Sequence, residues 1–176
     1  MLIRTFADAF EVFEREAFRL ELLPCYDVPQ DHARYRQYLA GEPLPSAPKQ
    51  FWIDYLGRMV TSGRHVRRVH VLPACFTPYL RYEIEWGYLY SAQAGEEIYL
   101  LPDCDYPSIV GTAQVLDFWL FDDRIAFNMH YDAEGHFLDA MATTDEAEVR
   151  RLVKIKQTLL QVAMPLRQWL ARERAK

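Results

Sequence analysis

Cysteine is scarce in this 176-residue sequence, which contains only Cys25, Cys75 and Cys104 at wide spacing. No Cys-x-x-Cys pair occurs, and an odd number of isolated thiols is typical of a reduced, cytoplasmic protein and not of a disulfide scaffold. Cys25 and Cys75 stand next to a proline or an alanine in apolar surroundings, where a thiol is usually an inert core residue. We therefore expect a cytoplasmic protein without a cysteine nucleophile.

Long apolar runs and an excess of basic residues are also absent. No segment approaches the ~18 apolar residues of a membrane span, and acids within the first ten positions argue against a signal peptide. The 20 Lys and Arg are outnumbered by 25 Asp and Glu, which gives a net charge of −5. General binding to nucleic acid needs a basic face. We expect neither a membrane nor a nucleic acid as a direct partner.

The sequence lacks the motifs of common active sites. There is no Gly-x-Ser-x-Gly, no Gly-x-x-x-x-Gly-Lys, no Gly-x-Gly-x-x-Gly and no His-Glu-x-x-His. Acidic pairs are plentiful, Glu83/Glu85 among them, and most fall at the ends of expected elements, where acids cap and are solvated. A general acid needs an apolar pocket around it, and the sequence shows none. We therefore predict no catalytic residues and no cofactor.

Apolar residues, by contrast, make up 51% of the chain, and aromatic residues are frequent enough to fill a core. The most informative segment is 115–145, where aromatic-rich runs are separated by turn signals at Asp122-Asp123 and around Gly135. Turn residues between apolar runs are the pattern of a β-meander. The segment therefore predicts a sheet.

The first run of this meander is apolar on both faces. The two-residue period of a strand places Asp117, Trp119 and Phe121 on one face. Phe118 and Leu120 fall on the other face. We predict a strand that is covered on both sides, with Trp119 buried.

Helix and strand patterns alternate through the rest of the chain. Thr77-Pro78 is a cap followed by a first-turn proline, and Pro165 predicts a kink or break near the end of the last helix. The expected helices are 5–17, 31–39, 50–62, 77–92 and 145–169, and the expected strands outside the meander are 18–22, 66–72 and 97–101.

This order of elements predicts an α/β (α+β) fold, with helices packed on a mixed sheet, a C-terminal β-meander and a long C-terminal helix. Three prolines within residues 42–48 indicate a linker. We divide the chain into an N-terminal helical element with this proline-rich linker, 1–48, and a main α/β domain, 49–176.

Three groups of residues could carry a site. His130, Asp132 and His136 lie around a tight turn and have the residue types of a metal site. Polar residues at a hairpin tip are usually only solvated, so we assign no metal.

The second group is a basic cluster at the start of the strand 66–72. Arg68 and His70 share one face of this strand, opposite Val69 and Val71. With Arg64, they form either salt bridges to the abundant acids or an anion-binding patch for a small anionic ligand or an acidic partner.

The third group is an aromatic stripe on one face of the helix 77–92. It consists of Tyr79, Tyr82, Trp86 and Tyr90, at spacings of three, four and four. The stripe is either core packing or the lining of a groove for a ligand or partner.

Short motifs over nearly the whole chain carry a family resemblance; they are Phe18-Arg-Leu-Glu, Tyr26-Asp-Val-Pro, Gly63-Arg-His-Val-Arg-Arg-Val, Pro78-Tyr-Leu-Arg-Tyr-Glu, Ala94-Gly-Glu-Glu-Ile and Asp117-Phe-Trp-Leu-Phe-Asp-Asp. They resemble an uncharacterised actinobacterial domain-of-unknown-function family, often encoded beside helix-turn-helix regulators of the XRE type. The resemblance implies a genomic context and not a reaction.

The element order is also similar to half of a phospholipase D-like domain, whose enzymes carry His-x-Lys-x-x-x-x-Asp at the meander. With Asp122 in place of the motif aspartate, Val115 and Asp117 stand where the histidine and lysine would be. Neither could attack a phosphodiester or stabilise its charge. This resemblance implies a non-catalytic scaffold, like the sensor domains of some transcription regulators.

We therefore expect a non-catalytic regulatory or accessory protein that acts by binding, with a helix-turn-helix transcription regulator as its partner. The alternative is a small-molecule or anion sensor that uses Arg68, His70 and the aromatic stripe; the third is an enzyme of unknown reaction. A pocket with convergent polar groups would favour the sensor, and an exposed aromatic patch would favour the partner.

Overall fold

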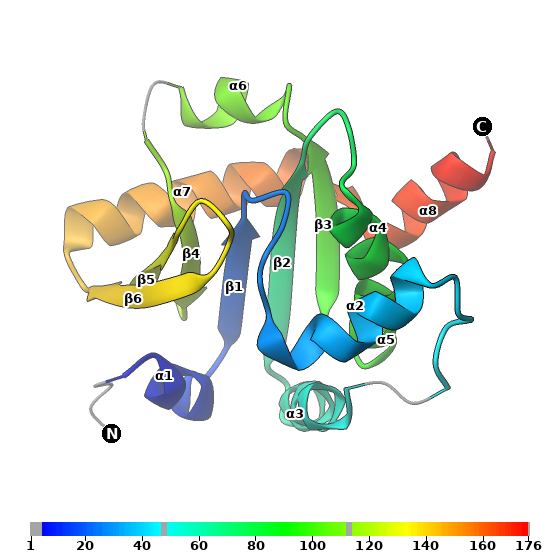
Figure 1. Ribbon diagram of the computed structural model, residues 1–176. Helices are drawn as coiled ribbons and strands as arrows, with labels where there is room; N and C mark the ends of the chain where they lie inside the picture. The colour runs from blue at the N-terminus through cyan, green and yellow to red at the C-terminus, as the bar shows by residue number, and fades with distance from the viewer. Residues whose placement is uncertain (1–4, 47–48, 112–113, 176) are drawn as a thin grey trace.

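The structure, a computed structural model, describes residues 5–46, 49–111 and 114–175. These residues form a mixed sheet of seven strands in the order β6-β5-β4-β1-β2-β3-β7 (Figure 1). β1, β2 and β3 run parallel, and every other neighbouring pair is antiparallel. The strands are β1 Glu16–Glu21, β2 His65–Leu72, β3 Glu97–Pro102, β4 Asp117–Phe121, β5 Ile125–Tyr131, β6 Phe137–Thr143 and β7 Met164–Pro165. The predicted α/β fold is confirmed.

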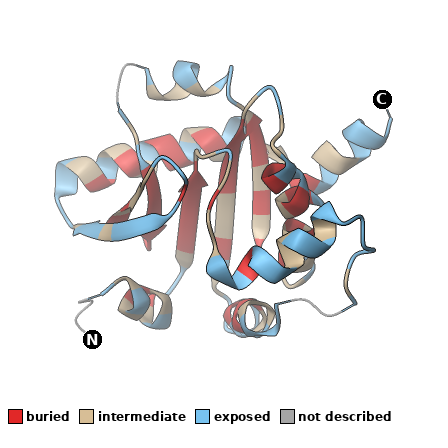
Figure 2. Cartoon of the chain, viewed as in Figure 1, coloured by how far each residue is buried: buried red, intermediate tan, exposed pale blue. Residues whose placement is uncertain are grey.

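Helices cover both faces of the sheet (Figures 1 and 2). The long helix α7 packs on one face, while α1 and α3 pack on the β4–β5 side of the other. The α4–η2–α5 helix packs over β2 and β3 on that second face, with α2 laid against it. The helices are α1 Phe6–Val12, η1 Pro29–Asp31, α2 His32–Leu39, α3 Gln50–Thr61, α4 Pro78–Tyr82, η2 Glu83–Gly87, α5 Tyr88–Gln93, α6 Tyr106–Val110, α7 Glu146–Val162 and α8 Leu166–Arg174.

The strands β4, β5 and β6 form the predicted β-meander. Its first turn, Asp122-Asp123, has positive φ at both residues, 53° and 59°, which suits a tight hairpin. The Asp122 carboxylate accepts the backbone N–H groups of Glu14, Arg15 and Glu16 at 2.7–3.0 Å. This carboxylate therefore ties the turn to the residues that lead into β1.

The two-sided burial of β4 is also confirmed. Trp119 is 7% exposed and packs with Phe121 in the cluster under α1 and α3. Phe118 and Leu120 point to the opposite face and pack against α7. Covered on both sides, β4 can be apolar along its length.

The C-terminal helix breaks where Pro165 predicted. Helix α7 ends at Val162 and α8 begins at Leu166, because Pro165 has no N–H to continue the helix. Of the three residues between them, Met164–Pro165 pair with β3 as the short strand β7. The sequence pattern gave no sign of β7 or α6, and the first helix ends at Val12, earlier than expected.

The strand β1, from the predicted N-terminal element, lies in the middle of the sheet between β2 and β4. Residues 47 and 48, where the predicted linker meets the main domain, lie outside the described residues, so the division at 48 stays a prediction. The expectation of a core Cys75 is wrong: this residue is exposed, and Cys25 is half-buried.

Candidate binding pocket

Polar side chains gather in the middle of the sheet, on the face opposite α7. Arg19 and Glu21 of β1 pair in register with Arg68 and His70 of β2. Because side chains alternate along a strand, all four project to the same face, next to Asp117 of β4. The prediction that Arg68 and His70 point away from the apolar α7 face is confirmed.

Arg19 and Asp117 form the first part of this buried network. The Arg19 Nη2 atom donates to Asp117 Oδ2 and to the Tyr131 hydroxyl, both at 2.9 Å. The Tyr26 hydroxyl donates to the same Asp117 oxygen at 2.5 Å. Burial raises the pKa of Asp117, and the Arg19 charge opposes that rise. The Nη1 atom of Arg19 is buried without a hydrogen-bond partner among the described residues.

Arg68 forms the second part. Its Nη1 atom donates to Glu21 Oε1 at 2.6 Å, and its Nε atom donates to Glu96 Oε1 at 2.8 Å. Burial by itself would raise the pKa of Glu21, but the charges of Arg68 and its other neighbours, with a hydrogen bond from Arg68, together outweigh burial and hold this pKa at about 2. Glu21 is therefore an anion at neutral pH.

His70 and Tyr88 continue the network toward the helices. The Nε2 atom of His70 faces the Leu23 carbonyl at 3.0 Å, so this nitrogen carries the hydrogen. Burial lowers the pKa of His70, so the ring is neutral and Nδ1, 2.6 Å from the Tyr88 hydroxyl, is an acceptor. The Tyr88 hydroxyl also lies 2.9 Å from Glu21 Oε2. One hydroxyl proton thus faces two acceptors.

Glu83 faces this network from the helical layer. The chain changes from α-helix to a single π-helical turn at Glu83–Gly87, a distortion that often marks functional sites. The Glu83 carboxylate lies 3.2 Å from the Tyr79 hydroxyl and 3.4 Å from the Tyr88 hydroxyl. Burial, reinforced by the negative charge of Glu21, raises the pKa of Glu83 to about 8. Glu83 is thus a half-buried acid that holds its proton near neutral pH.

A pocket of about 680 Å³ opens above these residues, between η1, α3, the α4–η2–α5 helix and the β5–β6 turn. Its volume lies within the range of small-molecule sites. The aromatic residues of its lining are Tyr26, Trp52, Tyr79, Tyr82, Trp86, Tyr88, Tyr90, Tyr131 and Phe137. The charged residues and histidine of its lining are Glu21, Asp27, Asp31, Arg34, Lys49, Arg68, Glu83 and His136.

The structure does not bring the predicted basic cluster together. Arg68 lines the pocket, and His70 lies behind it, fully buried. Arg64 stands apart, because its guanidinium donates to the Phe13 carbonyl and the Ser62 hydroxyl and does not reach the pocket. The salt-bridge alternative describes Arg68 best.

The aromatic stripe forms one wall of the pocket. All four of its residues, Tyr79, Tyr82, Trp86 and Tyr90, line the pocket. The first three are also buried in an aromatic cluster with α2, so packing and lining are not exclusive. The sequence showed no pocket around an acid, whereas the structure places Glu83 in the lining of this one, beside Tyr79 and Tyr88.

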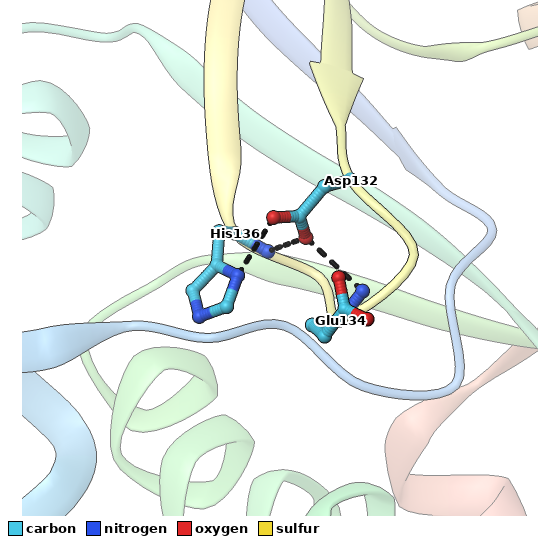
Figure 3. Close-up of side chains that lie close together, drawn as sticks. All are labelled: Asp132, Glu134 and His136. Atoms are coloured by element: carbon cyan, nitrogen blue, oxygen red, sulfur yellow. Dashed lines mark hydrogen bonds and ion pairs between the residues drawn. The ribbon is translucent and has the colours of Figure 1, made fainter.

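Asp132, Glu134 and His136 form a separate cluster at the β5–β6 turn, with one ligand atom of each within 4.8 Å of the others (Figure 3). Asp132 Oδ1 accepts the backbone N–H groups of Glu134 and His136, and Asp132 Oδ2 lies 2.8 Å from His136 Nδ1. His130 instead faces Asp139 at 3.6 Å. The turn's own hydrogen bonds account for this cluster, and it gives no further sign of a metal.

The fold and the pocket together define a single-sheet α/β domain with an aromatic cavity that ends on buried charged groups. A family model for a domain of unknown function, DUF6879, matches residues 4–171, so the chain belongs to this family. No curated protein matches the chain. Among the helices of the described residues, none has both the length and the apolar character to cross a membrane.

Proposed function

We propose that the chain is a small-molecule-binding domain, the sensor alternative of the sequence analysis. The observation that carries this proposal is the pocket, in which an aromatic wall converges on a few charged groups. Such a combination is typical of ligand sites, because apolar walls supply affinity and a few polar groups fix orientation. The raised pKa of Glu83 adds support, since perturbed carboxyls cluster at functional sites.

Gly87 offers a direct test of the pocket. It lines the cavity, and a Cβ added there meets nothing within 4 Å, so a larger side chain would enter the cavity without a clash in the core. Gly57 is a matched control, because it is also helical, also has open space at its Cβ and lies outside this pocket.

The experiment is a thermal-shift screen of a metabolite library against the wild type, Gly87→Leu and Gly57→Leu. We expect compounds that raise the melting temperature of the wild type and of Gly57→Leu by several degrees, and of Gly87→Leu by none. Compounds that stabilise Gly87→Leu as much as the wild type bind elsewhere. That result would remove the pocket from consideration.

The raised pKa of Glu83 also supports a second candidate function, that of an enzyme. A carboxyl with a pKa near neutral pH suits a general acid. Conversion of a bound compound, detected by mass spectrometry in the same screen and abolished by Glu83→Gln, would favour catalysis over sensing. The helix-turn-helix partner stays a prediction from the family resemblance.

A further inference from the structure

We propose that the ligand of this pocket is an organic cation, whose ammonium group lies among the tyrosine and tryptophan rings against the Glu83 carboxyl. This inference rests on the proposed function and names its ligand class. It comes from comparing the acidic side chains of the pocket: most of them already have a basic partner, and one does not.

The other acids that line the pocket already have cationic or histidine partners. Glu21 accepts from Arg68, Asp31 pairs with Lys49, and Asp27 pairs with His32 and His136. The negative charges of these three acids are therefore already balanced within the protein.

Glu83 is different. Its two hydrogen-bond partners are the neutral hydroxyls of Tyr79 and Tyr88. Its nearest nitrogen base is His70 Nδ1 at 3.7 Å, on a ring that burial keeps neutral. No Lys or Arg of the described residues forms an ion pair with Glu83. A positive charge brought by a ligand would therefore meet a carboxyl that the protein itself does not neutralise.

The rings around Glu83 suit the same ligand. Tyr79, Tyr82 and Trp86 line the pocket beside it, and their ring centroids lie 6.0 Å apart in sequence order. The face of an aromatic ring carries partial negative charge, so it attracts a cation within about 6 Å and repels an anion. An aromatic wall beside a carboxyl is therefore a suitable surface for an ammonium group.

An anionic ligand is the competing alternative. Arg68 Nη2 makes no hydrogen bond within the described part of the chain, so it could meet an anion. Its other two donor nitrogens, however, are held by Glu21 and Glu96, which already balance its charge. An anion would also bring negative charge close to Glu21. We therefore favour the cation.

The proposal predicts that binding releases a proton. The groups that face Glu83 come from several elements. They are Glu21 from β1, Cys25 from the segment after β1, Asp31 from η1, Arg68 and His70 from β2, Tyr79 and Tyr82 from α4 and Tyr88 from α5. None of them forms a direct ion pair between Lys or Arg and this carboxyl, so below about pH 8 Glu83 holds its proton until the ligand arrives. A bound cation favours the carboxylate, so affinity should rise with pH.

The test compares three probes of similar size: benzyltrimethylammonium, benzyl alcohol and phenylacetate. The first is a permanent cation, so any pH dependence of its binding belongs to the protein. Dissociation constants are measured by ligand-observed NMR from pH 6 to pH 9, and proton release by calorimetry in two buffers of different ionisation enthalpy.

We expect the cation to bind at least tenfold more tightly than the other two probes at pH 9. Its affinity should rise by up to tenfold per pH unit between pH 6 and 8, with up to one proton released per cation bound. Glu83→Gln should abolish both the pH dependence and the release, while Glu85→Gln, an exposed neighbour, should change neither.

Two outcomes overturn the cation: tighter binding of phenylacetate, or cation binding without proton release by the wild type. The second needs no variant, so misfolding of Glu83→Gln cannot obscure it. Gly87→Leu separates the two proposals. If it blocks whichever probe binds, the pocket stands even when the cation fails; if it blocks none, the proposed function fails as well. If no probe binds, the cation inference fails, and the thermal-shift screen alone decides the pocket.

Discussion

Glu83 shows how a single carboxyl acquires unusual chemistry from its surroundings. It lies four residues after Tyr79, so a helical projection already places both on one face. Its high pKa, however, depends on burial beneath other elements and on Glu21, which comes from β1. The sequence can therefore suggest where Glu83 points, but not what it faces.

This carboxyl should make stability depend on pH. The pKa of Glu83 is about 8 in the folded protein and about 4.3 in an unfolded chain. Between these values the folded state holds a proton that the unfolded state has released, so stability falls as pH rises. The fall is at most about 1.4 kcal/mol per pH unit for one group. It should be absent from Glu83→Gln.

The measurement is urea unfolding from pH 5 to pH 9, read as the difference between the wild type and Glu83→Gln. Groups far from Glu83 titrate equally in both proteins, so the difference isolates Glu83 together with the neighbours that it influences, chiefly Glu21. Glu85→Gln serves as the control, since Glu85 is exposed. A difference that stays constant from pH 5 to pH 8 would show that the Glu83 carboxyl has an ordinary pKa.

At the scale of elements, short sequence patterns predicted features that depend on neighbouring residues, such as helix caps. Thr77 accepts the N–H of Leu80 as a cap, as the Thr77-Pro78 pair predicted. Asp145 caps α7 by accepting the N–H of Glu148. The sequence pattern predicted one continuous helix over residues 77–92 and did not reveal the π-helical turn at Glu83–Gly87. Met164–Pro165 pair with β3 as β7 because β3 presents a free edge, which no local pattern can reveal. The prediction that Arg64 joins Arg68 and His70 in one site is wrong, because residues that are close in sequence need not contact the same pocket.

The β5–β6 hairpin docks on the segment before η1 through Gly135. Its φ is +87°, and an added Cβ would lie 2.6 Å from the Cys25 carbonyl oxygen. The Gly135 carbonyl also accepts the Asp27 N–H at 3.0 Å. Gly135→Ala should therefore cost about 1–3 kcal/mol of stability from backbone strain, with more from the clash.

Gly41→Ala is the matched control for this prediction. Gly41 also has positive φ, +73°, but a Cβ there meets nothing within 4 Å. The comparison by thermal unfolding separates strain from close contact, and hydrogen exchange of the Asp27 amide reports on the docked hairpin. Equal losses for the two variants, with unchanged exchange at Asp27, would show that the hairpin does not need this contact.

At the scale of the whole molecule, the buried network joins strands from distant parts of the chain. Arg19 of β1 donates to Asp117 of β4, and Glu21 of β1 accepts from Arg68 of β2. An isolated buried charge is costly, so each of these residues depends on its partner. The pocket floor therefore forms only when all three strands are assembled.

This dependence predicts that residues 49–176 do not fold alone, although their composition suggested a main domain. Removing residues 1–48 deletes β1 from the centre of the sheet, which separates β2 from β4. Asp117 then loses Arg19, and Arg68 loses Glu21, the one of its two carboxylate partners that lies on β1. We expect the 49–176 fragment to lack a cooperative unfolding transition by circular dichroism and to show poorly dispersed amide signals by NMR.

The control is a chain that begins at residue 5, which keeps β1 and the Thr5 cap of α1 and should unfold cooperatively. A cooperative transition in the fragment would show that β4 can pair without β1, and the division at residue 48 would then be a true domain boundary. In that case the polar residues of β1 would serve the ligand pocket more than the fold.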